Sequence, residues 1–317
     1  MTIVVTGSAG HLGEALMRTL RAANRPACGV DLKPSPFTDR VGSINDRGFV
    51  GECLRGARVV VHCATLHKPH VSTRADEDFL TTNAAGTLML LETAADVGLE
   101  AFVYTSTTSV FGSALTAHAG EPAAWITEDV APIPKNIYGA TKQAAETLCE
   151  LYARQRRLPA VVLRASRFFP EADDDPRVAA AYDVANAQVN ELLYRRVDID
   201  DVVAAHLLAL EKAPALGFAR FIVSATPPFT RDDAMELRAD AAAATRRVFP
   251  DYQAIYAKRG WRMFPSIDRV CDNRAAVAEL GWRPQYDFRH ALDCVAAGRD
   301  FRSPLAQTIG VKGYHSG

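Results

Sequence analysis

The chain is predicted to fold as an α/β protein, a doubly wound parallel sheet with a smaller C-terminal substrate lobe. Short apolar runs, such as Thr2–Thr6 and residues 58–63 (RVVVHC), alternate with stretches whose leucines have helical spacing, such as Leu12, Leu16 and Leu20. The apolar runs lack polar alternation, which is typical of strands buried on both faces of a parallel sheet. The alternation of strands with helices predicts that helices cover both faces of that sheet.

The elements follow in order along the chain. Each expected strand is a short, β-rich apolar run, and each expected helix has apolar residues at intervals of three or four. The expected strands are residues 2–6, 27–30, 58–63, 101–106, 160–163 and 218–224, and the expected helices are residues 12–22, 79–97, 138–154 and 200–210.

The pattern weakens after residue 166, which sets the expected domain boundaries. Residues 1–166, with about 197–225 returning to them, are predicted to form the sheet domain. Residues 167–196 and 226–317 are predicted to form the substrate lobe. Within the lobe, residues 171–175 (EADDD) are interpreted as a solvated acidic loop.

Composition excludes several classes of partner. Lys and Arg total 36 against 37 Asp and Glu, so a broad nucleic-acid surface is not expected. No apolar stretch is long enough for a membrane span, and no secretory signal is visible. The six cysteines are scattered without a CxxC pair, which indicates free thiols and a cytoplasmic protein without a metal site.

A glycine-rich turn follows the first expected strand and opens the first helix. Its sequence is TGSAGHLG, with Gly7, Gly10 and Gly13 in a GxxGxxG pattern. The first glycine permits a tight turn, the second lets the backbone approach a pyrophosphate, and the third lets the helix pack on the sheet. The free N–H groups of the helix start, at His11 and Leu12, receive the phosphates. This context predicts a Rossmann dinucleotide site.

Asp31 ends the second expected strand and predicts which dinucleotide binds. A carboxylate at this position accepts hydrogen bonds from the adenosine ribose and repels a 2′-phosphate, so NAD is the expected cofactor. Lys33 lies close by and softens that preference.

The expected catalytic pair is Tyr138 and Lys142. They form a YxxxK pattern on a predicted helix, where positions i and i+4 share one face. A cation beside the phenol is expected to lower the tyrosine pKa toward working pH. The hydroxyl-rich stretch 104–109 (YTSTTS) ends the fourth expected strand, at the sheet edge where ligands bind, and offers a hydroxyl to the substrate oxygen.

With these motifs in this order, the chain resembles the extended short-chain dehydrogenases, which include NAD-dependent sugar epimerases and dehydratases, and UDP-glucose 4-epimerases are nearest in pattern. The resemblance includes VVHCAT at 60–65, NAAGTLMLLETA at 83–94, ITEDVAPIPKNIYGATK at 126–142 and VDIDDVVAAH at 197–206. It implies Thr107 as the third catalytic residue, a homodimer formed by the helices near 79–97 and 138–154, and a sugar-type substrate. The further cofactor-binding residues that it implies are Ser43, Ile44, Cys63, Ala64, Thr65, Asn83, Thr105, Ser106 and Ala165.

The chain departs from the sugar-nucleotide pattern where that family binds its substrate. Arg167 replaces an asparagine, and Tyr194 stands at the position of a diphosphate-binding arginine, although Arg195 and Arg196 adjoin it. The stretch between these points is shorter than in the sugar-nucleotide members. Two readings stay open: a nucleotide sugar in a rearranged lobe, or a smaller sugar acid or sugar phosphate bound by arginine forks. In both readings the substrate-binding candidates include Thr107, Thr108, Arg167, Arg195 and Arg196.

The sequence argues against two other functions, a 4,6-dehydratase and a non-catalytic, NAD-binding protein. A 4,6-dehydratase needs an acid beside the catalytic threonine, and Thr108 and Ser109 stand there instead, so that mechanism is not expected. A non-catalytic, NAD-binding regulatory protein is the alternative from another class. The complete set of Thr107, Tyr138 and Lys142 argues against it.

The loop after the third expected strand adds one more candidate. It runs Leu66-His67-Lys68-Pro69-His70 at the binding edge of the sheet, so His67 either contacts substrate or is part of a solvated loop. A metal site is not expected, because the proline breaks the helical geometry that two histidines three residues apart require.

Overall fold

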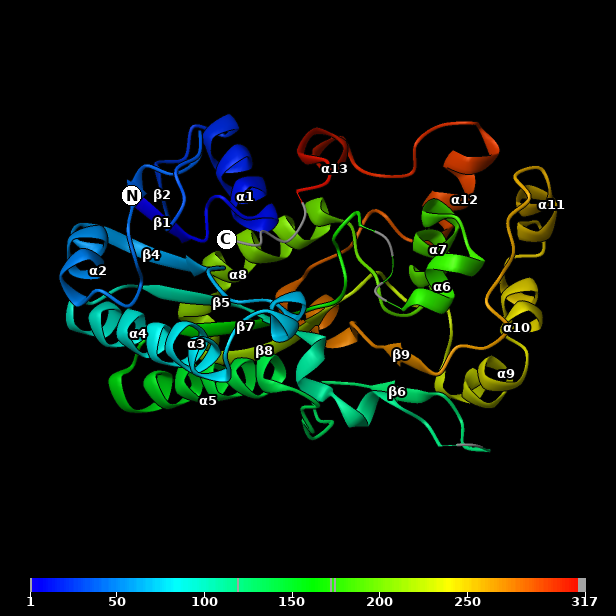
Figure 1. The fold of residues 1–317 in the computed structure, drawn as a ribbon, viewed down its shortest axis with the longest axis horizontal. Coiled ribbons are helices and arrows are strands. Elements are labelled where there is room, and N and C mark those ends of the chain that lie inside the picture. The colour runs from blue at the N-terminus through cyan, green and yellow to red at the C-terminus, as the bar shows by residue number, and fades with distance from the viewer. Residues whose placement is uncertain (1, 119, 172, 174, 313–317) are drawn as a thin grey trace.

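A seven-stranded parallel sheet forms the left half of the molecule in Figure 1. The computed structural model describes residues 2–118, 120–171, 173 and 175–312. The strand order is β3-β2-β1-β4-β5-β7-β8, which reverses direction between β1 and β4 as in a doubly wound fold. The expected α/β class is therefore confirmed. The strands are β1 (Thr2–Thr6), β2 (Ala27–Asp31), β3 (Arg40–Val41), β4 (Ala57–His62), β5 (Ala101–Thr107), β7 (Ala160–Ala165) and β8 (Phe218–Val223).

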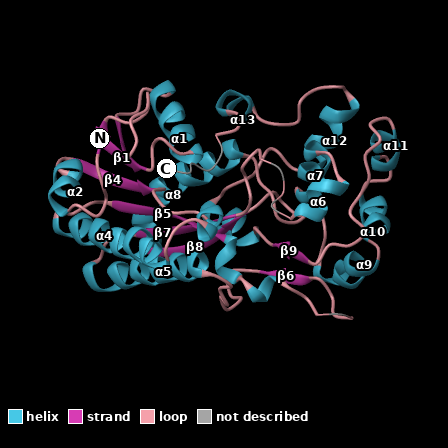
Figure 2. Cartoon of the chain, in the orientation of Figure 1, coloured by secondary structure: helices cyan, strands magenta, loops and turns pink. Residues whose placement is uncertain are grey.

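Helices cover both faces of the sheet, as Figure 2 shows in cyan around the magenta strands. Alternate residues of β1 explain why: Ile3 and Val5 join an apolar cluster with α1 and α8, whereas Val4 joins one with α2, α4 and α5. The covering helices are α1 (His11–Ala22), α2 (Arg47–Leu54), α3 (Asp76–Phe79), α4 (Gly86–Asp96), α5 (Ile137–Arg156), α8 (Ile199–Leu216) and α13 (Pro304–Ile309).

The helix expected over residues 79–97 is interrupted. A π-helical turn, η2 (Leu80–Ala85), separates α3 from α4, and Asn83 lies buried within it. Such turns are rare and often mark functional sites. Hydrophobic spacing did not indicate this turn.

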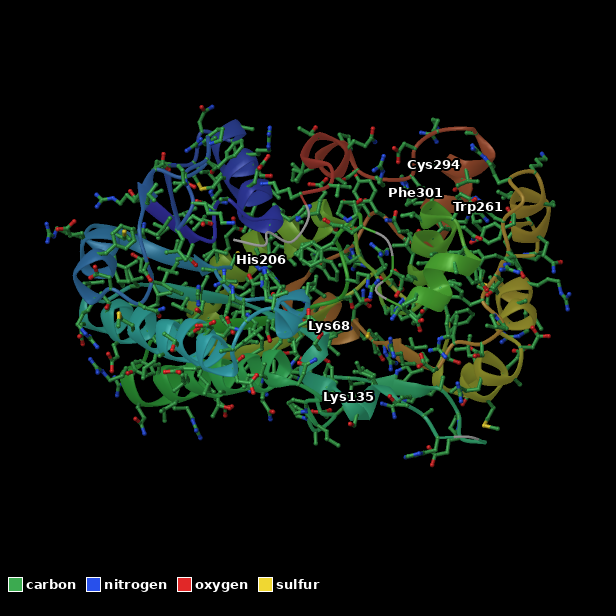
Figure 3. The ribbon with its side chains drawn as sticks, viewed as in Figure 1. Lys68, Lys135, His206, Trp261, Cys294 and Phe301 are labelled. Atoms are coloured by element: carbon green, nitrogen blue, oxygen red, sulfur yellow. The ribbon has the colours of Figure 1, made fainter. Side chains whose placement is uncertain are left out.

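A second apolar cluster lies at the right of Figure 1, around a small parallel sheet of β6 (Ala124–Ile126) and β9 (Arg269–Cys271). Its helices are α6 (Pro176–Ala181), α7 (Val184–Glu191), α9 (Ala234–Ala239), α10 (Ala241–Val248), α11 (Tyr252–Ala257) and α12 (Phe288–Ala296). Trp261, Cys294 and Phe301 are labelled in this part of Figure 3.

The division into a sheet domain and a lobe stays a prediction, and two findings bear on its boundaries. Ala276, Leu280 and Trp282 are buried against α1 and α8 rather than in the lobe cluster. Conversely, Ala123 packs in the lobe cluster although it precedes residue 166.

Candidate active site

A pocket of about 290 Å³ lies at the carboxyl edge of the large sheet, where the sheet meets the lobe. Lys68, labelled near the middle of Figure 3, is on its rim. The sequence-predicted residues that line it are Gly7, Gly10, His11, Leu12, Gly13, Cys63, Thr65, His67, Thr105, Ser106, Thr107, Thr108, Tyr138, Lys142, Ala165, Arg167 and Arg195. The strand order brings them together, because parallel strands end at a common edge.

The glycine-rich turn has the backbone that its glycines were expected to allow. Gly7 has φ +75°, and a Cβ atom there would lie 2.7 Å from the nitrogen of Ala64. A Cβ atom on Gly13 would lie 1.9 Å from the Gly7 carbonyl oxygen. Gly10 caps α1 without a side chain, so within the described chain the N–H groups of the first turn are left for a ligand. This cradle fits a pyrophosphate.

Asp31 lies at the end of β2 beside the cradle, outside the described pocket lining. Its carboxylate accepts hydrogen bonds from the backbone nitrogens of Ala9 (2.9 Å) and Lys33 (2.9 Å). These contacts fix the carboxylate next to the turn. Ser43 and Ile44, which the resemblance assigned to cofactor binding, likewise lie outside the lining, and Ile44 packs near Gly86 of α4.

Asn83 acts through its neighbours rather than by lining the pocket. Its amide holds both backbone groups of Leu66, accepting from the nitrogen at 2.8 Å and donating to the oxygen at 3.1 Å. It also donates to the Thr141 hydroxyl at 3.2 Å. Asn83 therefore ties the loop of His67 to α5, one residue before Lys142.

Tyr138 and Thr107 meet inside the pocket. Thr107 ends β5, and Tyr138 is the second residue of α5, whose N-cap Asn136 accepts a hydrogen bond from Gly139 at 3.0 Å. Both residues line the same pocket, which is the arrangement expected for a shared substrate oxygen. The His67 ring lies 6.3 Å from the Tyr138 ring, centroid to centroid.

Lys142 is fully buried one turn further along α5. Its ammonium donates to the Thr105 carbonyl oxygen at 2.6 Å and lies 4.2 Å from the centroid of the Tyr104 ring. Burial lowers the pKa of Lys142 to about 7.

The expected lowering of the Tyr138 pKa is wrong for the chain without cofactor. Burial raises this pKa to about 12, and the hydrogen bond from Thr107 opposes the rise only in part. The physical reason is desolvation, which penalises the phenolate, while the Lys142 ammonium is directed at Thr105. Helical spacing alone did not reveal how deeply this face of α5 is buried.

The three arginines singled out in the sequence lie together. The backbone of Arg167 pairs with residues 195–197, accepting from Val197 at 3.1 Å and donating to the Arg195 carbonyl at 3.2 Å. Arg167 and Arg195 line the pocket. Arg196 is not in the described lining, because its guanidinium donates to Glu191 (2.7 Å) and to the Phe169 carbonyl (2.8 Å).

The acidic loop is not simply solvated, so that interpretation is wrong for Asp173. Its side chain is 3% exposed and forms ion pairs with Arg195 (2.7 Å) and Arg167 (3.1 Å). Glu171 of the same loop lies 3.5 Å from the His11 ring. Within this loop, Asp173 is therefore a partner of Arg167 and Arg195 rather than a solvated charge.

Sequence reasoning missed several pocket residues, two of them from a distant segment. Arg269 and Cys271 come from β9, and no motif indicated that this strand would close the site. The remaining additions to the lining are Lys68, Pro69, Ser109, Leu115, Ser166, Phe168, Phe169 and Glu171.

Two expected absences can be compared with the described residues. Within them, no group of three or more His, Cys, Asp or Glu is arranged to hold a metal ion. No helix in the same part of the chain is long and apolar enough to cross a membrane.

The fold, the glycine-rich cradle and the set of Thr107, Tyr138 and Lys142 in one pocket are those of the extended short-chain dehydrogenase class. The chain belongs to the NAD dependent epimerase/dehydratase family, which it matches over residues 3–217, more than half of its length. Its cofactor class is therefore NAD.

Individual relatives are more distant. The chain is 26% identical over 314 residues to GDP-6-deoxy-D-mannose reductase of Pseudomonas aeruginosa, covering 95% of this chain and 97% of that protein. It is 27% identical over 321 residues to UDP-glucose 4-epimerase of Rhizobium meliloti, covering 90% and 93%. Other curated relatives match about half of the chain and between 40% and 57% of their own length.

Solved structures give the same fold. A short-chain dehydrogenase/reductase superfamily protein from Agrobacterium tumefaciens with bound NAD superposes with a TM-score of 0.67 at 24% identity, covering 94% of this chain and 96% of that one. Similarity at this identity establishes the architecture alone.

Proposed function

We propose that the protein oxidises a hydroxyl-bearing carbon of a sugar-type substrate with NAD, as a nucleotide sugar 4-epimerase does. The observation that carries this proposal is the joint position of Tyr138, Thr107 and Lys142 in the pocket that the glycine-rich turn also lines. Gly7 to Gly13 would hold the NAD pyrophosphate, and Asp31 the adenosine ribose.

The proposed reaction uses the pocket residues as follows. NAD held in the cradle would accept a hydride from the substrate carbon as its C–OH becomes C=O. Tyr138 takes the hydroxyl proton, and Thr107 holds the same oxygen by a hydrogen bond. Tyr138 must be a phenolate to take this proton, and the positive charge of the nearby Lys142 ammonium favours that form. An epimerase then returns hydride and proton to the other face of the ketone, whereas a dehydrogenase releases the ketone.

A substrate panel tests the proposal and separates these outcomes. Nucleotide sugars, uronic acids and sugar phosphates are incubated with the protein and NAD, and both NADH release and product stereochemistry are measured. An epimerase inverts a carbon without net NADH, and a dehydrogenase accumulates NADH. If no sugar-type compound reacts, the proposed function is contradicted.

The second candidate is a dehydrogenase of a smaller anionic sugar acid or sugar phosphate. It is favoured by Arg167 and Arg195, which line the lobe end of the pocket with Arg269. Guanidinium groups bind carboxylate and phosphate through two parallel hydrogen bonds.

We expect Arg195→Met to raise KM by roughly ten- to a hundredfold with little change in kcat. A charge-assisted contact contributes about 1.5–3 kcal/mol, and about 1.4 kcal/mol is tenfold. A contact far from the reacting carbon is equal in ground and transition states, so kcat is spared. Steady-state kinetics with the substrate found in the panel measure this effect.

Arg177→Met is the matched control, because the Arg177 side chain is 90% exposed and pairs with Asp175 outside the pocket. Arg167→Met is made alongside it. Wild-type KM in both the Arg167 and Arg195 variants would leave the arginines a purely structural role and would contradict the anionic-substrate reading.

We expect the protein to bind NAD more tightly than NADP. The Asp31 carboxylate, held by Ala9 and Lys33, would face the 2′-phosphate of NADP and repel it. Calorimetric titration with both cofactors measures the ratio of the two affinities, and Asp31→Asn should bring the affinity for NADP closer to that for NAD. Tighter binding of NADP by the wild type would mean that Lys33 dominates at this position.

Three further proposals follow from the family. We propose a cytoplasmic homodimer formed by α4 and α5, a sugar-type small molecule as the natural partner, and substrate recognition by the lobe of residues 167–196 and 226–317. Sedimentation of wild type against a variant with a charged residue at Leu80, which is 52% exposed beside α4, tests the dimer.

A further inference from the structure

A cluster of five charged side chains closes the lobe end of the pocket. Arg167, Arg195 and Arg196 surround Glu191 and Asp173, with Arg195 lying 2.6 Å from Glu191 and 2.7 Å from Asp173. Arg196 lies 2.7 Å from Glu191. Burial raises the pKa of Asp173, and the charges of Arg167 and Arg195 oppose that rise. Three guanidinium groups thus face two carboxyl groups, and the cluster carries surplus positive charge.

The two acids hold this cluster in different ways. Glu191 belongs to α7, is 1% exposed and contacts all three arginines, so its pKa is lowered to about 2 by their charges against the opposing effect of burial. Asp173 comes from the loop between β7 and α6 and contacts Arg167 and Arg195. Glu191 is therefore a counter-ion on a helix, whereas Asp173 is a counter-ion on a loop.

The arginines that Asp173 contacts are the ones that reach the pocket. Arg167 and Arg195 side chains are 22% and 19% exposed and line it, whereas Arg196 is 7% exposed and does not appear in the described lining. One carboxylate oxygen of Asp173, Oδ2, contacts both guanidinium groups that face the proposed substrate, while Oδ1 accepts a hydrogen bond from the Asp175 nitrogen. A ligand carboxylate or phosphate would offer the same chemistry to the same donors.

We propose that Asp173 occupies the place of an anionic group of the substrate, and that Arg167 and Arg195 exchange the loop carboxylate for the substrate's carboxylate or phosphate on binding. This inference rests on the proposed function, since it assumes a substrate in this pocket. It makes Asp173 a residue that sets affinity for negatively charged substrates. A neutral sugar has no group to replace it and would leave the ion pairs intact.

The test compares anion binding by Asp173→Asn and wild type without cofactor, so that it does not depend on turnover. Asparagine keeps an oxygen for the Asp175 nitrogen, which now donates to Asp173 at 2.8 Å, but it removes the competing charge. The probes are D-glucuronate, glucose 6-phosphate and glucose, titrated by calorimetry. Asp173→Asn should bind one or both anionic probes at least tenfold more tightly than wild type and should bind glucose unchanged. The better anionic probe identifies carboxylate or phosphate as the group.

Asp175→Asn is the matched control, because it removes one carboxylate from the same loop while leaving an N-cap oxygen for α6, and Asp175 pairs with the exposed Arg177. It should bind the anions as wild type does. Asp173→Ser is a second variant for the event that asparagine lowers the melting temperature.

Unchanged or weaker anion binding in folded Asp173 variants would overturn the proposal, as would an equal gain in Asp175→Asn or an equal gain for glucose. The two proposals can fail separately. If the wild-type protein turns over no compound of the substrate panel but Asp173→Asn still binds the anionic probes more tightly, the proposed function is contradicted and the exchange at Asp173 is supported.

Discussion

Tyr138→Phe is expected to lower turnover by roughly 10²–10⁴-fold while the fold and NAD binding survive, because removal of a positioned acid–base group costs about this much. The substitution deletes one hydroxyl group and keeps the ring, which is 7% exposed and packed beside His67. The hydroxyl is the group that meets Thr107 in the pocket. Turnover is measured on the substrate that the panel identifies, and NAD affinity by calorimetry.

Tyr152→Phe is the control for this substitution. Tyr152 lies on the same helix, α5, but outside the described pocket lining, so the same chemical change there should leave turnover unaltered. Wild-type turnover in Tyr138→Phe would contradict the proposed mechanism. An equal loss in both variants would instead indicate damage to α5.

Glu146→Gln is expected to lower the free energy of unfolding by about 3–5 kcal/mol, because it leaves a buried charge without its partner. Glu146 and Arg164 are each 2% exposed and lie 2.8 Å apart between α5 and β7. Glu146 also accepts a hydrogen bond from Ser106 at 2.5 Å, on the strand that carries Thr107. Glu146 therefore joins α5, which carries Tyr138, to both β7 and β5. Denaturant unfolding measures the loss.

Two controls separate the buried charge from a general effect of mutation. Asp96→Asn removes one partner of an exposed pair, with Arg156 48% and Asp96 60% exposed, and should cost at most about 1 kcal/mol. The double variant Glu146→Leu with Arg164→Met replaces the pair by apolar groups and should recover much of the stability. If Glu146→Gln costs no more than Asp96→Asn, the buried pair does not stabilise the fold as argued.

Patterns among neighbouring residues were sufficient to predict the large sheet and the cofactor cradle. Six of its strands are continuous apolar runs, and Gly7 and Gly13 lie where backbone must touch backbone, so adjacent residues carry the whole signal. β3 consists of Arg40 and Val41, both exposed, and had no such signal. The YxxxK spacing likewise placed Tyr138 and Lys142 on one helix.

The environment of those residues was decided by packing. Burial raises the pKa of Tyr138 and lowers that of Lys142, because neighbouring elements exclude water from both groups, and no residue spacing reports how much water remains. The π-helical turn at Asn83 also depends on contacts between segments, because the Asn83 amide forms hydrogen bonds with Leu66 and Thr141 from two other segments.

The sequence alone determined the fold class and the glycine-rich cradle, and it predicted Asp31 and the Thr107–Tyr138–Lys142 set, because each depends on residues close together in the chain or on a motif of fixed order. Only the tertiary structure decided which arginines face the pocket, that Asp173 pairs with two of them, and that Arg269 of β9 joins them. The physical reason is that ion pairing and burial are set by distances between segments far apart in the chain. The loop acid Asp173, which looks solvated in the sequence, pairs with Arg167 and Arg195 because the backbone of Arg167 runs beside that of Arg196.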